Sequence, residues 1–469
     1  MIAELKPYQE FKESGLPWLG KVPGHWNVKR AKSIFQRIDE RSKTGKEELL
    51  TVSSARGIVP RKSANVTMFK AESYLGYKLC WPGDLVINSL WAWAGGLGVS
   101  RHHGIVSSAY GIYRIRQDAP MIPAFVHEVV RSSSFNWELR VRSKGVWISR
   151  LQLTDISFLD APMHIPPSAE QAAIVRFLDW ANGRLERAIR AKRKVIALLN
   201  EQKQAIIHRA VTRGLDPAVP LKRSGSRWFP ELPAGWEALT LRRVITSAID
   251  GPHFSPQYQD AGIPFLSARN VRADRWILSD AKFISEADFI EFSRRVRPEV
   301  GDVLYTKGGT TGVARAVDLT FPFQVWVHIA VLKLKRDRMV PAFLAYCLNS
   351  PRCYEQAQLF TRGATNQDLG LGRMKDIELP VPPTLGEQNT IVDFLDSECS
   401  AFTTAISRLE REIELLREYR TRLVADVVTG KLDVRDAVAR LPDEVPLDTT
   451  VDDGDVGEES GAAEEEAAA

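Results

Sequence analysis

Several groups of arginine, lysine and asparagine lie near tryptophan or glycine, an arrangement suited to contacts with a polyanion. Arg56, Arg61 and Lys62 occur within Ser-Ala-Arg-Gly-Ile-Val-Pro-Arg-Lys. Such cations bind phosphates, and Arg and Asn can also make bidentate contacts to base edges. Further candidates in the first half are Asn88, Trp91, Trp93, Arg101, Lys144 and Trp147. Core packing is the commoner role for each of these tryptophans.

The second half offers a comparable set around a glycine-rich segment. Lys307-Gly-Gly-Thr-Thr-Gly312 is a polar loop with one cation, suited to a backbone or groove contact. It is no phosphate-binding P-loop, because no Gly-Lys-Ser/Thr follows. A plain turn role for His253, beside Pro252, stays open. The candidate contacts in this half are His253, Arg269, Asn270, Arg272, Lys307, Thr310, Thr311, Arg362 and Asn366.

The patterns that catalysis on DNA requires are missing from the sequence. Asp302 and Lys307 lack the intervening acid of a metal-dependent nuclease, and there is no Walker loop. The Pro-Pro pairs after Ile165 and Val381 lack the polar residue of an amine-methylating site. We therefore predict no enzyme, and neither a metal nor a cofactor in this chain. The cysteines show no metal-binding spacing and indicate reduced thiols in the cytoplasm: Cys80, Cys347, Cys353 and Cys399.

The charge is strongly asymmetric. The chain has a net charge of +5, but the segment from Pro442 onward carries eleven acids and no Lys or Arg. The rest of the chain therefore carries +16. A basic body favours a nucleic-acid partner, because neutralising phosphates releases counterions. We expect the acidic segment to be disordered, and no apolar run is long enough to predict a membrane span.

A repeat of about 217 residues organises these candidates. Trp18 and Trp26 recur as Trp228 and Trp236 at an offset of 210, and further identities recur downstream. Pro-Pro followed by Glu170-Gln171 returns as Pro-Pro followed by Glu387-Gln388, an offset of 217. One offset kept over so many identities indicates a tandem duplication.

Each repeat has two parts. The first mixes β-branched or aromatic runs with turns, as in 84–87, 111–115, 302–305 and 325–332, which predicts strands of a mixed α/β (α+β) domain. The second, roughly 168–213 and 385–430, contains no proline and reads as one long helix. We predict a domain over 1–165, a helical segment over 166–222, a domain over 223–381, a helical segment over 382–435 and a tail over 436–469.

The two predicted helices share an apolar stripe at spacings of three, four and seven, which favours an antiparallel coiled coil between them. Packing of each helix on its own domain is the alternative. Lys192 interrupts the stripe, and could either specify the register or reach solvent. The predicted pairing residues are Ile174, Leu178, Leu185, Ile189, Ile196, Leu199, Ile206, Ile391, Leu395, Phe402, Ile406, Leu409, Ile413, Leu416 and Leu423.

The order domain, helix, domain, helix resembles the specificity subunits of type I restriction-modification systems. Pro82-Gly-Asp-Leu-Val-Ile87 with the following Trp- and Gly-rich run resembles that family's target-recognition domains, as do Asp250-Gly-Pro-His253 and Gly301-Asp-Val-Leu-Tyr-Thr-Lys307. The Pro-Pro and Glu-Gln start of a long helix resembles its conserved spacers. The likeness covers roughly 16–435.

The resemblance implies a reader of a split double-stranded DNA target, with half-sites about one helical turn apart and helices that set their separation. It implies two methyltransferase subunits and translocase-nuclease subunits as partners, which would use S-adenosylmethionine, ATP and Mg²⁺. Two other classes are alternatives: an enzyme that acts alone on DNA, and a coiled-coil scaffold that does not read sequence. Divergence of the two domains between about 27 and 165 argues against the scaffold.

Overall fold

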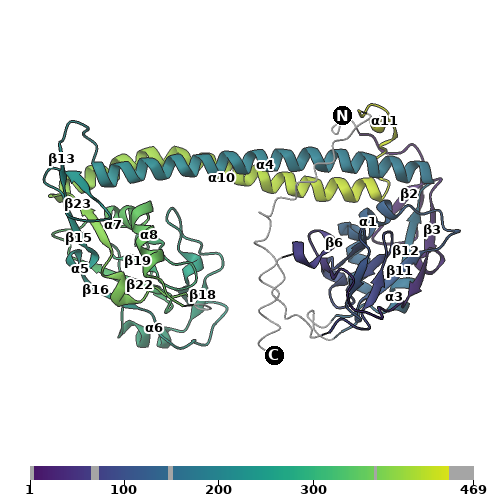
Figure 1. The fold of residues 1–469 in the computed structure, drawn as a ribbon, viewed down its shortest axis with the longest axis horizontal. Coiled ribbons are helices and arrows are strands. Elements are labelled where there is room, and N and C mark those ends of the chain that lie inside the picture. Colours follow the sequence, from purple (N-terminus) through teal and green to yellow (C-terminus); the bar gives the residue numbers. More distant parts are fainter. Residues whose placement is uncertain (1–4, 65–72, 146–150, 364–366, 443–469) are drawn as a thin grey trace. The chain divides into compact units, whose positions relative to one another are not determined.

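The computed structural model describes residues 5–64, 73–145, 151–363 and 367–442. The chain divides into two compact units, unit 1 with Met1–Ala191 and Glu412–Ala469, and unit 2 with Lys192–Arg411. Each unit combines a mixed α/β part with portions of two long helices (Figure 1). Among the described helices, none is long and apolar enough to cross a membrane.

Unit 1 is built on a four-stranded antiparallel sheet of order β4-β11-β8-β9. Its strands are β4 (Phe35–Ile38), β11 (Gly111–Ile115), β8 (Leu85–Ile87) and β9 (Leu97–Val99). Short pairs surround it: β1 (Phe11–Glu13) with β2 (Lys21–Pro23), β3 (Asn27–Arg30) with β12 (Pro162–Ile165), β5 (Leu50–Ser53) with β6 (Gly57–Pro60), and β7 (Lys78–Cys80) with β10 (Gly104–Val106). The helices α1 (Pro123–Arg131), α2 (Ser133–Arg142) and α3 (Asp155–Leu159) follow the sheet in the chain.

Unit 2 repeats this plan, with a sheet of order β16-β22-β19-β20. These strands are β16 (Ile245–Asp250), β22 (Ile329–Leu334), β19 (Val303–Thr306) and β20 (Ala314–Ala316). The pairs β13 (Leu221–Arg223) with β14 (Glu231–Pro233) and β15 (Glu237–Thr240) with β23 (Glu378–Val381) match pairs of unit 1. The helices are α5 (Leu241–Val244), α6 (Glu286–Ser293), α7 (Pro341–Leu348), α8 (Pro351–Phe360) and α9 (Leu371–Met374). The equal strand order supports the duplication inferred from the repeat.

Unit 2 also has a three-stranded sheet, formed by β18 (Lys282–Ile284), β17 (Ile263–Leu266) and β21 (Gln324–Val325). The single strand predicted over 325–332 is therefore wrong in detail. The chain leaves β21 after Val325, turns through Trp326-Val-His328, and begins β22 at Ile329. A continuous apolar run cannot reveal this break, because both pieces are buried on different sheets.

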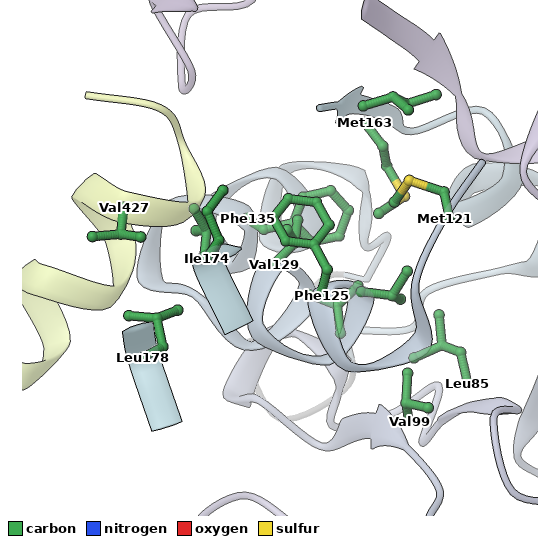
Figure 2. Packing of buried hydrophobic residues seen from close by; sticks show 14 of the residues in the cluster. Leu85, Val99, Met121, Phe125, Val129, Phe135, Met163, Ile174, Leu178 and Val427 are labelled. Carbon is green, nitrogen blue, oxygen red and sulfur yellow. The ribbon is translucent and has the colours of Figure 1, made fainter. Parts of the chain in front are cut away.

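The long helices predicted from the stripe are confirmed as α4 (Ser168–Arg213) and α10 (Leu385–Val428). Within unit 1, Ile174 and Leu178 share a core with Leu423 and Val427, and Arg420 donates to Glu186 at 3.2 Å. Figure 2 shows Ile174, Leu178 and Val427 in the same core as Phe125 and Phe135. All of the predicted pairing residues are buried or half-buried.

Within unit 2, the C-terminal part of α4 lies against the N-terminal part of α10. Ile207 and Val211 share a core with Ile391 and Leu395, and the Lys203 ammonium donates to the Thr403 hydroxyl at 2.9 Å. In each unit the numbering of one helix rises as the other falls, so the helices are antiparallel there (Figure 1).

The repeated Glu-Gln pair attaches each helix to its unit. The Trp26 indole donates to Glu170 at 3.0 Å, and the Trp236 indole donates to Glu387 at 2.8 Å. Gln171 accepts from the Ile122 amide at 2.8 Å, directly before α1, and Gln388 accepts from the Val340 amide at 2.8 Å, directly before α7. The repetition of these residues is thus explained by structure alone, as the sequence indicated.

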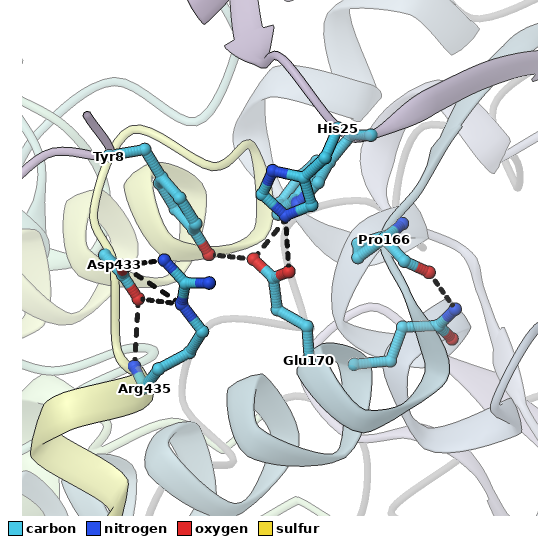
Figure 3. Close-up of polar contacts among 8 residues, drawn as sticks. Tyr8, His25, Pro166, Glu170, Asp433 and Arg435 are labelled. Carbon is cyan, nitrogen blue, oxygen red and sulfur yellow. Dashed lines mark hydrogen bonds and ion pairs between the residues drawn. The ribbon is translucent and has the colours of Figure 1, made fainter. Parts of the chain in front are cut away.

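In unit 1, residues near both ends of the described chain also meet around Glu170 (Figure 3). The Tyr8 hydroxyl donates to Glu170, whose second oxygen lies 2.8 Å from the His25 ring. Arg435 lies over the Tyr8 ring at 5.2 Å and pairs with Asp433 at 2.6 Å. Burial raises the pKa of Tyr8, which keeps its hydroxyl protonated as a donor.

The predicted start of the tail at residue 436 needs correction. Residues Arg435–Val438 form α11, and both Ala437 and Leu441 are buried in the core of unit 1. These apolar side chains keep the chain packed through Leu441, and residues 443–469 lie outside the described part.

Candidate nucleic-acid interface

In unit 1, the first group of predicted contacts lies on the hairpin β5–β6 and the turn after it. Arg56 is half-buried at the hairpin turn, and its guanidinium donates to the Ser63 carbonyl at 2.7 Å. Arg61 is half-buried and Lys62 is exposed, both in the 3₁₀ turn η3 (Arg61–Ser63). The hairpin therefore presents a short basic segment whose backbone is held by local hydrogen bonds.

The second group lies on the loop between β8 and β9. The Asn88 side chain accepts from the Leu90 amide at 3.2 Å, and the Trp91 ring, 37% exposed, stacks on Trp93 at 6.0 Å. Lys144 is exposed and pairs through its backbone with Gln152. Because the Leu153 amide then donates to the Ser89 carbonyl at 2.9 Å, Lys144 belongs to the same surface as this loop.

Arg101, the remaining candidate of unit 1 in the described part, is exposed just after β9. Trp147 lies outside the described residues, as does Asn366 of unit 2. The structure thus groups Arg56, Asn88, Trp91 and Lys144 around two neighbouring loops, whose closeness is seen at Gly95: a Cβ placed there would lie 3.9 Å from the Ser54 carbonyl oxygen.

Two residues of α1 that the sequence did not reveal hold these loops. His127 accepts from the Val99 amide at 3.2 Å, and burial lowers its pKa to about 4, so the ring is neutral and able to accept. One turn later, the Arg131 guanidinium reaches the hairpin and the β8–β9 loop together. It donates to the carbonyls of Ser54 at 2.7 Å, Ala55 at 2.9 Å and Leu97 at 2.9 Å, with longer contacts to Ser53 and Gly95.

In unit 2, Lys307 is 6% exposed and lies at the centre of an ionic cluster. Its ammonium is 2.8 Å from Asp368 and 3.5 Å from the buried Asp250. Asp250 also accepts from Arg295 and lies 3.4 Å from His253. Burial alone would raise the pKa of Asp250, but Arg295 and Lys307 together hold it below its usual value. The two phrases Asp-Gly-Pro-His and Asp-Val-Leu-Tyr-Thr-Lys, distant in sequence, meet at this cluster.

The prediction of a direct DNA contact by Lys307 is not favoured by this geometry, because both carboxylates would have to release the ammonium. The polar atoms of the Asn270 side chain are likewise occupied by hydrogen bonds within the unit. Asn270 is 1% exposed, accepts from the Ser267 amide at 2.8 Å and donates to the Ile277 carbonyl at 2.8 Å. Thr311 is buried and accepts from Gln358 at 3.2 Å. The side chains of Lys307, Asn270 and Thr311 therefore stabilise the loops that carry them.

Exposed positions remain on the same loops. His253, Thr310 and Arg362 are exposed around the Lys307 cluster, and the Arg362 backbone pairs with Asp368. Arg269 is exposed in the 3₁₀ turn η6 (Ala268–Asn270), and Arg272 beyond it is half-buried. Sequence reasoning missed Arg295 and Asp368, which no local motif marks.

The described part of the chain holds no group of three or more His, Cys, Asp or Glu that could bind a metal. All four cysteines are buried, and none is in a disulfide bond. Burial raises the pKa of Cys80 and of Cys353 to about 12, which makes these thiols poor nucleophiles.

Two α/β units with one strand order, joined to a pair of long helices, define a duplicated fold whose loops carry the polar and basic candidates. Residues 233–415 match the family of type I restriction modification DNA specificity domains. This match covers the α/β part of unit 2 from residue 233 onward and extends into α10 as far as residue 415.

Two specificity subunits of type I restriction enzymes are similar to this chain in sequence. The chain is 22% identical over 208 residues to the StySPI specificity subunit of Salmonella potsdam, covering 43% of this chain and 44% of that one. It is 20% identical over 444 residues to the MjaIX specificity subunit of Methanocaldococcus jannaschii, covering 91% and 97%. The chain thus aligns with less than half of the first relative's length.

A solved structure from work on assembly and conformational transition of the type I R-M system resembles the fold. Its TM-score is 0.59 at 16% identity, over 88% of this chain and 99% of that one. Together the comparisons confirm the predicted resemblance: this chain is similar to type I restriction-modification specificity subunits.

Proposed function

We propose that the chain is the non-catalytic, sequence-reading specificity subunit of a type I restriction-modification complex. Each α/β unit would read one half of a split double-stranded DNA target. The observation that carries the proposal is the specificity-domain match in unit 2 together with the same strand order in unit 1. One plan used twice, with different loops, suits an asymmetric target with two half-sites.

The proposed contacts are the exposed or half-buried cations and polar groups on the loops. In unit 1 these are Arg56, Arg61, Lys62, Asn88, Trp91, Arg101 and Lys144. In unit 2 they are His253, Arg269, Arg272, Thr310 and Arg362, with Lys307, Asn270 and Thr311 as supports. Arginine and lysine would contact phosphates, whereas arginine and asparagine could also reach base edges.

The helices would pair as an antiparallel coiled coil that fixes the spacing of the two half-sites. Two methyltransferase subunits and translocase-nuclease subunits are the proposed partners. S-adenosylmethionine, ATP and Mg²⁺ would serve those partners. Modification of adenine and cleavage would take place on them, because the sequence of this chain lacks the nuclease, amine-methylating and Walker motifs.

The decisive experiment is co-expression of this chain with its neighbouring methyltransferase gene, followed by long-read mapping of methylated adenines. We expect a split motif that disappears when this chain is omitted. A stable complex that methylates without any sequence preference would contradict the proposal and favour a scaffold. Methylation of the same motif by the methyltransferase alone would also contradict it.

A further inference from the structure

The guanidinium of Arg131 bridges two loops that carry proposed DNA contacts of unit 1. One is the turn of the β5–β6 hairpin, which holds Arg56 and leads to Arg61 and Lys62. The other is the β8–β9 loop, which holds Asn88 and Trp91. Arg131 donates to the carbonyls of Ser54 and Ala55 on the first, at 2.7 and 2.9 Å. On the second it donates to the Gly95 carbonyl at 3.4 Å, and it also donates to the carbonyl of Leu97, where β9 begins, at 2.9 Å.

Arginine suits this task for a physical reason. A guanidinium carries several N–H donors in a rigid planar fork, so one side chain can satisfy carbonyls from two segments at a fixed geometry. A lysine ammonium is a point charge on a flexible stem and cannot impose the same geometry. The carbonyl acceptors belong to the backbone, so the fork sets the loop paths whatever side chains the loops carry.

The strands that carry the two loops, β6 and β9, are themselves held close together. A Cβ on Gly98 of β9 would lie 3.3 Å from the Gly57 Cα of β6, so the strands approach closely. His127, one turn before Arg131 on α1, holds β9 through the Val99 amide. The turn 54–56 and the loop 88–96 extend beyond this close contact, and the Arg131 side chain donates to carbonyls of both.

Unit 2 has a shorter side chain at the corresponding place. Ser132 donates to the carbonyl of Val129 and Ser350 to that of Cys347, each three residues earlier, so Arg131 corresponds to Asn349. Asn349 donates to the Ala314 carbonyl at 2.7 Å and accepts from the Ala314 amide at 2.9 Å. Asn349 also donates to the Ala345 carbonyl of its own helix at 2.8 Å, so beyond α7 its side chain bonds to the edge strand β20, which corresponds to β9.

We propose that Arg131 is a positioning residue that aligns the two reading loops of unit 1, and that recognition of one half-site depends on it. The inference rests on the proposed function. Arg131 does not itself read bases here, since its terminal nitrogens are occupied by backbone carbonyls. Among the described residues, Asn349 of unit 2 makes no such bridge between loops, and this difference supplies an internal control.

The test uses the full chain in complex with its methyltransferase. Affinities are measured for the mapped target and for two DNAs in which one or the other half-site is scrambled. The variants are Arg131→Lys, which keeps the charge, and Arg131→Gln, which keeps part of the donor set. Asn349→Ala is the matched change in unit 2. Melting temperature and co-purification with the methyltransferase report on folding.

We expect Arg131→Lys to reduce discrimination at one half-site by about tenfold or more, the size of effect that a misplaced base contact produces. Discrimination at the other half-site should stay within about twofold, and Asn349→Ala should not affect the half-site that Arg131 controls. If Arg131→Gln fails to fold, Arg131→Lys alone decides.

Three results would overturn the inference. Arg131→Lys could keep full discrimination at both half-sites. Arg131→Lys could reduce discrimination at both half-sites equally, which indicates general destabilisation. Finally, Arg131→Lys could retain discrimination while Arg131→Gln weakens binding to all DNAs alike. If the salt dependence of Arg131→Gln also falls by about one phosphate contact, Arg131 contacts a phosphate directly instead. A wild-type complex without a split target would refute the proposed function itself, before any variant is made.

Discussion

At the scale of single residues, the repeated motifs serve attachment rather than chemistry. Glu170 and Glu387 each accept from a buried tryptophan indole. The glutamine after each accepts from the backbone amide directly before α1 in unit 1 and before α7 in unit 2. A buried indole N–H without a partner costs about 1–3 kcal/mol, so the pair Trp and Glu is retained in both units. The residues proposed to read DNA lie elsewhere, on loops that differ between the units.

His164 offers a test at this scale. It is fully buried in unit 1, stacked on Trp26 at 5.4 Å, and burial lowers its pKa to about 4. The unfolded chain binds a proton at this histidine near pH 6.5, whereas the folded chain does not. The contribution of neutral His164 to stability is therefore complete above about pH 6.5 and declines as the pH falls toward 4.

We expect His164→Phe to remove this dependence. The stability of the variant relative to the wild type should rise by up to about 1.4 kcal/mol for each pH unit below about 6.5. Denaturant unfolding at several pH values between 7.5 and 4.5 measures the difference. A constant difference over that range would show that His164 titrates alike in both states.

At the scale of elements, α4 has stretches with different surroundings along its length. Leu178 is fully buried beside Leu423 and Val427, whereas Leu198 is 51% exposed. Leu395 of α10, the repeat counterpart of Leu178, is fully buried in unit 2. Helices of this length gain most of their stability from such packing rather than from intrinsic propensity.

Truncation of the buried leucines should therefore be costly. Leu178→Ala and Leu395→Ala are each expected to lower the free energy of unfolding by about 2–5 kcal/mol, since each leaves a cavity. Leu198→Ala is the control and should change it by less than about 0.5 kcal/mol. Chemical denaturation monitored by circular dichroism measures all three. Equal effects at positions 178 and 198 would contradict the packing described for α4.

At the scale of the whole molecule, one structural plan occurs twice with different loops. Both sheets have the same strand order, yet unit 1 joins its loops with Arg131 and unit 2 gathers its loop around Lys307. Duplication keeps the scaffold while the loops diverge, because scaffold residues are constrained by burial and loop residues are not. Such divergence suits two different half-sites.

The proposed spacing role of the helices can be tested by shortening both. Deleting residues 194–197 and 409–412 removes four residues from each helix, about 6 Å of helical rise, which corresponds to about two base-pair steps. We expect the mapped target to keep both half-sites and to change the length of its spacer. An unchanged spacer in a folded, methylating complex would refute this role.

The sequence by itself determined the repeat, the two long helices and the resemblance to specificity subunits. Long-period identities and an apolar stripe report on burial along one element, which is local information. It also indicated that the Glu-Gln pairs are structural. It could not locate the break between β21 and β22, because buried strands on different sheets leave one continuous apolar run.

Only the tertiary structure decided which polar side chains are free and which are occupied. Lys307 and Asn270 look like surface contacts in the sequence, but carboxylates and carbonyls from distant segments surround them. Arg131 carries no motif, and its role follows from carbonyls brought together by the fold. Satisfaction of a polar group depends on neighbours far along the chain, and folding alone brings those neighbours into contact.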